Sequence, residues 1–429
     1  MRIEPAASIA GDVAVPGVKG SSQRAVLLAA VAEGPSVVRG FGRAADSDAA
    51  IAAARAFGAE VQDEDVDVVR VHGVGLRGVR APDGPIDCGN AGTVMRLLTG
   101  LLAGQNGSFE LVGDESLSTR PQERVAAPLR QMGAAIETND GHAPVRIDGR
   151  PLRSIRYELP VASAQVKSAI LLAGLYASGG ATTVVERVPT RDHTELMLPL
   201  FGARVRRGAR DAAVFPVERL TGAEIAIAGD FSSAAPFVVA AALVPGSTLR
   251  IHGVNVNSTR TGLLDVLERM GVPLALYNRR RESNEVVADL EVRSAERELR
   301  AVTVDAAEVP LLVDELPLVA LAAGLARGES VVRGAEELRV KESDRIETVT
   351  NALRAVGIRI EARPDGFAVR GVPTRPAGGR IDAAGDHRIA MLGAVAGLVS
   401  RDGVDVAGAE CVAISFPGFF DLLDSAARR

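Results

Sequence analysis

The chain of 429 residues has no tryptophan, and only 3% of its residues are aromatic. Proteins that bind single-stranded nucleic acid without sequence preference stack bases on aromatic side chains, so this scarcity argues against such a partner. The net charge of -5 also lacks the positive excess that would attract nucleic acid or an anionic membrane. We therefore expect neither nucleic acid nor a membrane as a partner.

Cysteine is equally scarce, with Cys88 and Cys411 as the only two. Two cysteines in so long a chain indicate a reducing compartment rather than a disulfide framework. The first ten residues include Glu4 and contain no apolar signal segment, and apolar stretches such as residues 316–326 are too short to span a bilayer. These features predict a cytoplasmic protein.

What the chain does have is a unit of roughly seventy residues that recurs six times. Each unit presents a polar or glycine-containing turn, then an apolar helix, a glycine break and a β-branched strand. A second helix closes most units at a glycine suited to a left-handed position, and the sixth unit is the least regular. The first helices are expected to begin at residues 21–24, 92–96, 163–168, 232–235, 314–316 and 386–388. The closing glycines are Gly58, Gly133, Gly202, Gly271 and Gly357.

This alternation of strands and helices predicts an α/β fold, and the length exceeds that of one ordinary core. Six units form two sets of three, each with helices buried inside a layer of sheet. We expect a first domain at 17–228 and a second made of 1–16 plus 229–429, with the ligand site in the cleft between them. The charged segment 277–300 is expected to be a surface excursion of the fourth unit.

The segment 16–24 places Lys19 and Arg24 around a small-residue turn at a helix start. Helix N-termini carry unpaired N–H groups and partial positive charge, so this arrangement suits a phosphate group. A nucleotide P-loop is disfavoured, because the lysine precedes the turn and the glycine spacing differs. A capped surface helix with incidental basic residues remains the plain alternative for this segment alone.

Three further helix starts carry polar or charged groups. Residues 87–96 form a second small-residue turn, and residues 338–345 carry five charges at a helix entry, which a solvated face would also explain. Asp314 begins an otherwise apolar helix, where burial could tune a base. His387 and Arg388 occupy the corresponding place in the sixth unit. Because these clusters recur at equivalent positions of the repeat, a shared function is favoured over unrelated surface charges at each helix start.

Read in order along the chain, these motifs resemble the 5-enolpyruvylshikimate-3-phosphate synthase family of enolpyruvyl transferases. The resemblance spans essentially the whole chain. It is carried by Pro16-Gly17-x-Lys19, Gly89-Asn90-Ala91-Gly92-Thr93, Arg120-Pro121, Ser163-Ala164-Gln165, residues 339–345 and Asp386-His387-Arg388-Ile389-Ala390.

The resemblance implies two similar domains, each of three βαβαββ units with helices inside sheets, an inside-out α/β barrel. It also implies a cytoplasmic, monomeric enzyme of the shikimate pathway that uses no metal or organic cofactor. Such an enzyme transfers the enolpyruvyl group of phosphoenolpyruvate to the 5-hydroxyl of shikimate 3-phosphate and releases phosphate.

The resemblance also implies roles for particular residues. Asp314 resembles the base at the substrate hydroxyl and Glu342 the acid at the methylene carbon, with Lys19 and His387 as further catalytic groups. The residues implied for phosphoenolpyruvate are Lys19, Gly92, Arg120, Gln165, Arg345 and Arg388. Those implied for shikimate 3-phosphate are Lys19, Gly20, Arg24, Ser163, Ala164, Gln165, Arg191, Asp314 and Lys341.

The chain departs from the family pattern at several positions. Gly20 stands where most members have serine, and Leu97 stands where one branch has proline. Residues 414–417, which begin with Ile414, lack the lysine that this branch carries before its Thr-Phe-Pro. Ala164, Lys167 and residues 190–195 are similar to the other bacterial branch instead. Gly92 retains the glycine beside which glyphosate binds in the family, so inhibition by glyphosate is expected.

Two alternatives stay open at this point. The sister enzyme that transfers enolpyruvyl to UDP-N-acetylglucosamine shares the fold, but its lysine is followed by asparagine and its loop usually carries a reactive cysteine. The corresponding loop, residues 114–120, has no cysteine. A non-catalytic anion-binding protein of the same fold is the second alternative, and the presence of Lys19, Asp314 and Glu342 argues against it.

Overall fold

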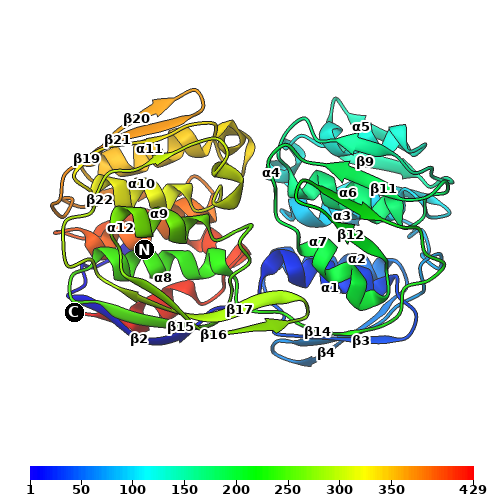
Figure 1. Cartoon of the computed structure of the whole chain (residues 1–429), viewed down its shortest axis with the longest axis horizontal. Helices are drawn as coiled ribbons and strands as arrows, with labels where there is room; N and C mark the ends of the chain where they lie inside the picture. Colours follow the sequence, from blue (N-terminus) through cyan, green and yellow to red (C-terminus); the bar gives the residue numbers. More distant parts are fainter. The chain divides into compact units, whose positions relative to one another are not determined.

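The structure is a computed structural model that describes all residues, 1–429. Its chain divides into two compact units (Figure 1). Unit 1 comprises Met1–Pro16, Ala228–Arg281 and Val286–Arg429, and unit 2 comprises Gly17–Ile227 and Glu282–Glu285. None of the helices combines the length and apolar character needed to cross a membrane.

Unit 2 contains three four-stranded sheets, one for each repeat. In each sheet two strands pair in parallel, and two more extend the sheet antiparallel. Parallel neighbours need a crossover connection, which the first helix supplies in the second and third repeats. The second repeat consists of β6 (Ile86–Asp87), α3 (Gly92–Leu102), β7 (Ser108–Val112), α4 (Glu115–Ser118), α5 (Glu123–Gln131), β8 (Ala135–Asn139) and β9 (His142–Asp148).

The other two repeats of unit 2 follow the same order. The third consists of β10 (Arg156–Glu158), α6 (Ala164–Gly174), β11 (Thr182–Val185), α7 (His193–Met197), the 3-10 helix η1 (Leu198–Phe201), β12 (Val205–Arg207) and β13 (Asp211–Val214). The first consists of α1 (Lys19–Ala30), β3 (Pro35–Arg39), α2 (Ala45–Ala56), β4 (Glu60–Asp65) and β5 (Val68–His72). Its leading strand is β14 (Glu224–Ala226), which pairs in parallel with β3 and so closes the unit on itself.

The fourth repeat, in unit 1, borrows its leading strand from the N-terminus. Strand β2 (Ser8–Ala14) pairs in parallel with β15 (Thr248–Asn255), and α8 (Phe231–Leu243) precedes β15 in the chain. The sheet has five strands because β24 (Ala427–Arg428) adds to β2. The repeat also contains α9 (Gly262–Met270), β16 (Leu274–Glu282) and β17 (Glu285–Arg293).

The fifth repeat is regular, whereas the sixth forms only a three-stranded sheet. The fifth consists of β18 (Thr303–Val304), η2 (Val309–Leu311), α10 (Leu316–Gly324), β19 (Gly328–Val332), η3 (Glu336–Val340), α11 (Arg345–Ala355), β20 (Arg359–Arg363) and β21 (Gly366–Gly371). The sixth consists of β22 (Gly379–Asp382), α12 (His387–Val399), β23 (Val404–Ala407), η4 (Ala409–Ile414) and α13 (Phe419–Ala426), with β1 (Arg2–Ile3) on β23.

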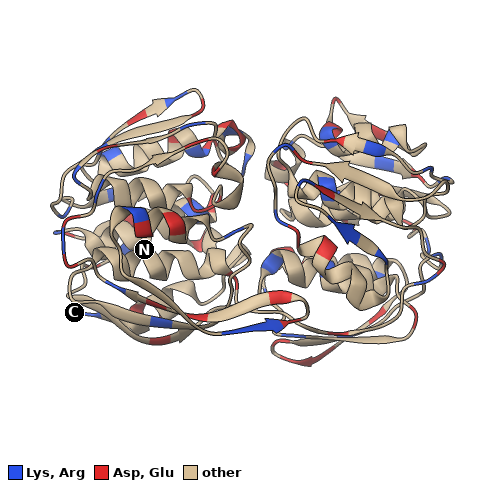
Figure 2. Ribbon diagram, viewed as in Figure 1, with Lys and Arg blue, Asp and Glu red and all other residues tan.

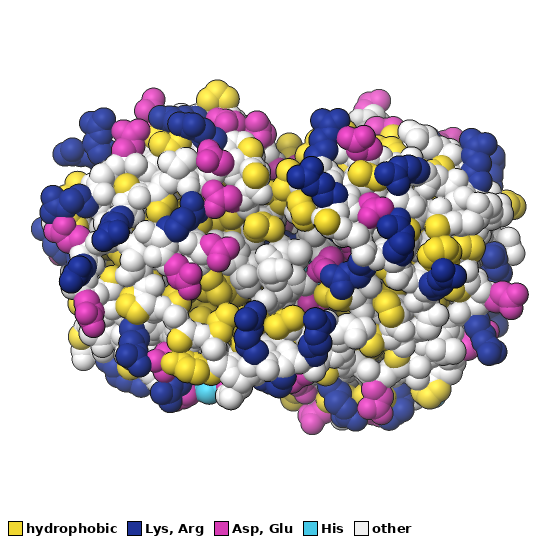
Figure 3. Space-filling view, in the orientation of Figure 1, with side chains coloured by type: hydrophobic (Ala, Val, Ile, Leu, Met, Phe, Trp, Pro, Cys, Tyr) yellow, Lys and Arg dark blue, Asp and Glu magenta, His cyan; other side chains and the backbone are white.

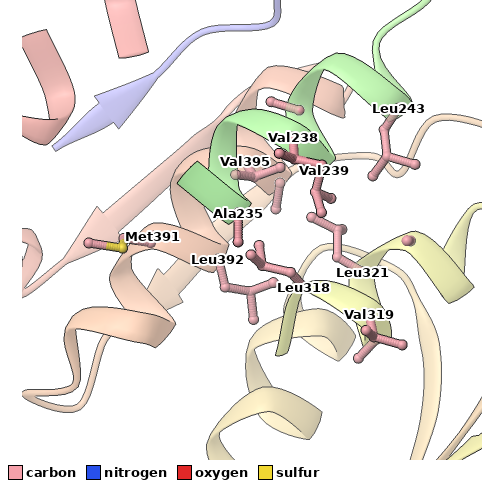
Figure 4. Close-up of a cluster of buried hydrophobic side chains, with 14 of the residues drawn as sticks. Ala235, Val238, Val239, Leu243, Leu318, Val319, Leu321, Met391, Leu392 and Val395 are labelled. Atoms are coloured by element: carbon pink, nitrogen blue, oxygen red, sulfur yellow. The ribbon is translucent and has the colours of Figure 1, made fainter. Parts of the chain in front are cut away.

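The first helix of every repeat lies in the core of its unit. Helix α8 is buried along its whole length and carries no charged side chain (Figure 2). A helix that is apolar all round belongs inside a core. Figure 4 shows the contact of α8, α10 and α12, where Ala235, Leu318 and Leu392 lie together. In unit 2, α3 crosses α6 so closely that a Cβ at Gly100 would lie 2.3 Å from the carbonyl oxygen of Ala169.

The structure confirms the expected closing glycines. All five have positive φ angles, from 86° at Gly202 to 101° at Gly133. Residues with a Cβ rarely adopt this left-handed conformation, whereas glycine does so readily. The second helix of each of the first five repeats therefore ends where the sequence predicts.

The expectation for residues 277–300 was wrong. Most of this segment belongs to β16 and β17, which are ordered strands at the edge of the five-stranded sheet. Strand β16 has no buried residues, so the alternation that marks a half-buried strand is missing from it.

Candidate active site

In unit 2, the predicted cations lie at the N-terminal ends of the inner helices. Lys19 is the first residue of α1, and no side chain caps this helix. Its Nζ lies 2.6 Å from Oδ2 of Asp46 on α2, so the ammonium is held at the open end of α1. The main-chain carbonyl of Asp46 also accepts a hydrogen bond from Gln23 Nε2 at 2.8 Å.

Arg24 lies one turn further along α1 and is buried. Its Nη1 donates to the carbonyl of Gly20 at 2.7 Å, and its Nε donates to Oγ1 of Thr194 at 2.8 Å. Thr194 belongs to α7, which follows the half-buried Arg191. The two arginines predicted to hold shikimate 3-phosphate are thus linked through one short segment.

The N-terminal ends of α3 and α6 meet through side-chain hydrogen bonds. Gln165 Nε2 donates to Oγ1 of Thr93 at 2.9 Å, and Arg96 donates to the amide oxygen of Gln165. Ser163 is the N-cap of α6 and accepts from the main-chain N–H of Val166 at 3.5 Å. The predicted residues Ser163, Ala164 and Gln165 therefore occupy the first turn of a helix that points unpaired N–H groups outward.

Arg120 lies beside the turn that precedes α3. Its Nη2 donates to Oδ1 of Asn90 at 2.6 Å and to Oγ of Ser116 at 3.0 Å. A Cβ placed on Gly92 would be 3.4 Å from Nη1 of Arg120 and 3.6 Å from Nη1 of Arg96. Glycine at this position thus lets two guanidinium groups lie close to the N-terminal end of α3.

In unit 1, the centre of the predicted site is the guanidinium of Arg345, which is buried. It donates from Nη2 to Oε2 of Glu342 at 2.6 Å and from Nε to Oδ2 of Asp386 at 2.7 Å. Its Nη1 lies 3.2 Å from Oδ1 of Asp314. Lys341 Nζ lies 3.7 Å from the same Asp314 oxygen. The structure therefore gathers the predicted base and the predicted acid around the guanidinium of Arg345, with Lys341 beside the base.

Electrostatics within this cluster are set by burial and by opposite charge. Burial alone would raise the pKa of Asp386, but the guanidinium of Arg345 outweighs this effect and the pKa is lowered. Burial likewise disfavours the charge of Arg345, yet Asp386 and Glu342 keep its pKa above the usual value. Both groups therefore stay ionised.

Asp386 also caps α12, which carries His387 and Arg388. Its Oδ1 accepts from the main-chain N–H of Arg388 at 2.9 Å, and His387 Nδ1 lies 4.0 Å from the same oxygen. The side chain of Arg388 donates from Nη1 to the carbonyl of Ser232 at 2.9 Å. This last contact joins the N-terminal ends of α12 and α8.

The helix start at Ser232 had no assigned role in the sequence. In the structure, Arg260 Nη2 donates to Oδ1 of Asp230 at 2.9 Å and to Oγ of Ser232 at 2.6 Å. Ser232 also donates to Glu315, the residue after Asp314. This buried network ties the predicted base to the ends of α8 and α12, and the sequence gives no local signal for Arg260.

The predicted residues thus form one group in each unit. Sequence reasoning missed Asp46, which pairs with Lys19, and Arg96, which donates to Gln165. It also missed Arg260 in the network around Ser232. Arg96 lies inside the motif at residues 87–96, and a positive charge so near a helix start could have been used to predict it as a site residue. No group of three or more His, Cys, Asp or Glu side chains is arranged to hold a metal ion. The group in unit 2 contains Lys19, Gly20, Arg24, Gly92, Arg120, Ser163, Ala164, Gln165 and Arg191, and that in unit 1 contains Asp314, Lys341, Glu342, Arg345, His387 and Arg388.

Residues 3–423 match the family model of EPSP synthase (3-phosphoshikimate 1-carboxyvinyltransferase). The chain belongs to the EPSP synthase family. The 3-phosphoshikimate 1-carboxyvinyltransferase of Acidithiobacillus ferrooxidans is 49% identical over 417 residues, which cover 97% of this chain and 95% of that protein. Its counterpart in Citrifermentans bemidjiense is 48% identical over 429 residues, which cover 100% of this chain and 99% of that protein.

Solved structures agree with membership of the EPSP synthase family. An EPSP synthase from Acinetobacter baumannii has a TM-score of 0.87 and 41% identity, with 99% of this chain and 98% of that chain covered. The enolpyruvyl transferase NikO from Streptomyces tendae has a TM-score of 0.81 at 20% identity, with 99% and 96% covered, and shows likeness of fold alone. The resemblance and the α/β fold expected from the sequence are thus confirmed.

Proposed function

We propose that this chain transfers the enolpyruvyl group of phosphoenolpyruvate to the 5-hydroxyl of shikimate 3-phosphate, with release of phosphate. The observation that carries this function is near-complete coverage by the EPSP synthase family model, together with 49% identity to a 3-phosphoshikimate 1-carboxyvinyltransferase. The chain is accordingly an enzyme, a transferase of the shikimate pathway that serves aromatic amino acid biosynthesis. The relatives do not favour the UDP-N-acetylglucosamine alternative or a non-catalytic protein.

The reaction proceeds by addition and then elimination. In the addition, the methylene carbon of phosphoenolpyruvate takes a proton while the 5-hydroxyl loses one and its oxygen bonds to the adjacent carbon. In the elimination, the resulting methyl group returns a proton, the double bond re-forms and phosphate leaves. The same acid and base can serve both steps, because their roles reverse in the elimination.

We assign the base to Asp314 and the acid to Glu342. Both carboxylates are partly exposed, with 16% and 19% of their side chains accessible, so substrate can reach them. Both also contact Arg345, which fixes their orientation. We assign Lys19, at the N-terminal end of α1, to a place between the two substrates, and His387 to the same reaction as a further catalytic group.

Phosphoenolpyruvate carries two anionic groups, for which we propose separate partners. Its phosphate is assigned to Lys19, Arg120, Gln165 and the N-terminal end of α3 at Gly92. Its carboxylate is assigned to Arg345 and Arg388. Arg345 already donates to three carboxylates. The carboxylate of the substrate would therefore replace one of these partners when it binds.

Shikimate 3-phosphate is assigned to a second set of groups. Arg24 and Arg191 supply charge, the first turn of α6 supplies N–H donors, and Lys341 and Asp314 approach the ring hydroxyls. Gly20 offers only its main chain here. The remaining members of this set are Lys19, Ser163, Ala164 and Gln165.

We further propose a cytoplasmic monomer that needs no organic cofactor or metal. The net charge of -5 and the scarcity of cysteine support this setting. On the face drawn in Figure 3, cationic and anionic side chains are interspersed, which does not favour nucleic acid or an anionic membrane as partner.

The decisive experiment measures phosphate release from phosphoenolpyruvate with each acceptor alone. Release with shikimate 3-phosphate only is expected. Release with UDP-N-acetylglucosamine only would assign the chain to the sister reaction. Release with neither acceptor, from folded protein that still binds shikimate 3-phosphate, would indicate a non-catalytic binding protein.

A further inference from the structure

A buried ion cluster lies behind the groups assigned to shikimate 3-phosphate. Lys167, on α6, places its Nζ 2.7 Å from Oε1 of Glu195 and 2.9 Å from Oε2 of Glu186. The three side chains are only 1%, 2% and 7% exposed, respectively. None of them belongs to the residues proposed to touch either substrate.

Fold stability alone is a weak reason for such a cluster. Removing charges from water costs several kcal/mol per ion, and apolar side chains of similar volume often stabilise a core equally well. Here two carboxylates share one ammonium, and Oε2 of Glu195 is buried without a hydrogen-bond partner. Burial opposes the charge of Lys167, but the two glutamates outweigh it and its pKa is raised. The ammonium is therefore permanently charged at the centre of the cluster.

The cluster fastens both ends of the segment 186–195 to α6. Glu186 follows β11 and Glu195 lies in α7, so Lys167 bridges the start and the end of the segment. Lys167 Nζ also donates to the carbonyl of Thr190 at 3.3 Å. The main-chain N–H of Thr190 in turn donates to Glu186 Oε1 at 3.1 Å. Arg191 is the next residue, so the hydrogen bonds to the main chain of Thr190 also restrict the position of the Arg191 main chain.

The same cluster is linked to Arg24 through neighbouring residues. Ser168 follows Lys167, Thr194 precedes Glu195, and their hydroxyl oxygens are 2.7 Å apart. Thr194 accepts the hydrogen bond from Arg24 Nε at 2.8 Å, and Ser168 accepts from Arg24 Nη2 at 3.3 Å. A shift of α7 relative to α6 would therefore turn the guanidinium of Arg24.

We propose that Lys167, with Glu186 and Glu195, is a positioning residue that sets Arg24 and Arg191 for binding the phosphorylated acceptor, shikimate 3-phosphate. The inference rests on the proposed function, because that function assigns the two arginines to this substrate. A charged hydrogen bond has a strong dependence on distance and direction, so a small displacement of both arginines weakens the anion site. Phosphoenolpyruvate, assigned to other side chains, is largely unaffected.

The test compares Lys167→Met with the wild type, using KM for each substrate, kcat, and the dissociation constant of shikimate 3-phosphate alone by calorimetry. The variant is expected to raise KM and the dissociation constant for shikimate 3-phosphate by roughly tenfold or more. The KM for phosphoenolpyruvate should change by less than about threefold, since Arg24 and Arg191 are assigned to shikimate 3-phosphate alone. Val145→Ala, which removes buried volume on β9 of the same unit, is the control for lost stability alone.

Lys167→Met leaves two buried carboxylates without a counter-charge and therefore also destabilises the fold. The triple variant Lys167→Met, Glu186→Gln, Glu195→Gln removes that charge, so it should regain thermal stability while keeping the raised KM. If the single variant does not fold, Glu195→Gln alone is expected to raise KM for shikimate 3-phosphate by about threefold.

Three results would overturn the inference. The first is an unchanged KM for shikimate 3-phosphate in folded Lys167 and Glu195 variants. The second is an equal rise of KM for both substrates, and the third is full recovery of KM along with stability in the triple variant. Each of these outcomes is distinct from failure of the proposed function, in which wild-type protein would release no phosphate with shikimate 3-phosphate.

Discussion

Arg345 Nη2 lies 2.6 Å from Oε2 of Glu342, three residues earlier in the chain. The group assigned to the carboxylate of phosphoenolpyruvate therefore holds the acid assigned to its methylene carbon. With these assignments, binding of phosphoenolpyruvate and orientation of the proton donor are coupled through this one guanidinium. Asp386, which receives two further bonds from Arg345, keeps it in place when the substrate arrives.

Glu342→Gln should lower kcat by about 10²–10⁴-fold, the range typical for loss of a general acid. Glutamine keeps the size of the side chain and can still accept a hydrogen bond from Arg345, so KM for phosphoenolpyruvate should stay within about threefold. Steady-state kinetics check this, with the exposed Glu336→Gln in the preceding η3 as control. A kcat equal to that of the control would remove Glu342 from the mechanism.

Asp314→Asn tests the proposed base. Turnover should fall by about 10²–10⁴-fold, because the amide cannot take the hydroxyl proton. Calorimetry should still detect binding of shikimate 3-phosphate, since the asparagine oxygen can accept hydrogen bonds. The control is Asp305→Asn, at an exposed residue directly after β18, and it is expected to behave as wild type. Retained turnover in Asp314→Asn would show that another group removes the proton.

Gly92→Ala tests the site assigned to the phosphate of phosphoenolpyruvate. The added methyl group would lie 3.4 Å from Nη1 of Arg120 and 3.4 Å from Cδ1 of Leu117, so it narrows the space in front of α3. We expect glyphosate to inhibit the wild type in competition with phosphoenolpyruvate. In the variant, inhibition should weaken and KM for phosphoenolpyruvate should rise by roughly tenfold, about 1.4 kcal/mol.

The matching control for Gly92→Ala is Gly84→Ala, because a Cβ at Gly84 meets no atom within 4 Å. Unchanged kinetics and unchanged glyphosate inhibition are expected for it. Wild-type activity that persists at glyphosate concentrations far above those of phosphoenolpyruvate would contradict the assignment of Gly92.

Local signals were enough to predict most of the repeated architecture. A left-handed glycine after an apolar helix depends on neighbouring residues only, and Gly58 and Gly357 both have φ above 90°. The candidate site could also be predicted from the sequence, because Asp314 and His387 lie at or just before helix starts that repeat along the chain. A motif that is weak by itself can be placed within a supersecondary unit when it recurs at the same position of each repeat.

Long-range contacts are what the sequence could not supply. Arg260 and Asp230 are 30 residues apart, and Arg24 and Thr194 are 170 residues apart. No periodicity relates such pairs, because they meet only after the helices pack. The sequence did not predict strand β16 for another reason. Its residues show no alternation of buried and exposed positions, and β16 is recognised as a strand only by its pairing with β17.

Both cysteines should be unreactive in the native protein at pH 8. Burial raises the pKa of Cys88 to about 12 and the pKa of Cys411 to about 11. Only the thiolate reacts with iodoacetamide, so mass spectrometry should find slow labelling at pH 8 and rapid labelling after unfolding in guanidinium. Rapid native labelling of Cys411 would contradict its raised pKa.

The same shift at Cys88 predicts the sign of a pH effect on stability. A thiol in an unfolded chain has a pKa of about 8.5, so the fold favours the protonated form. This contribution is fully present below about pH 8.5 and declines as pH rises toward the folded value of about 12. The urea midpoint of wild type should therefore fall more steeply above pH 8.5 than that of Cys88→Ala. Parallel curves would contradict the prediction.

The closing glycines should contribute to stability through the backbone alone. At Gly58, φ is 95° and an added Cβ would meet only side-chain atoms at 3.8 Å, so Gly58→Ala introduces strain without a clash. This substitution should destabilise unit 2 by about 1 kcal/mol, the cost of holding an L-residue in the left-handed region. Gly84→Ala, in the same unit and without a positive φ, should change stability by less than about 0.5 kcal/mol. Urea unfolding of both variants checks the difference, and equal midpoints would show that the helix end relaxes to accommodate alanine.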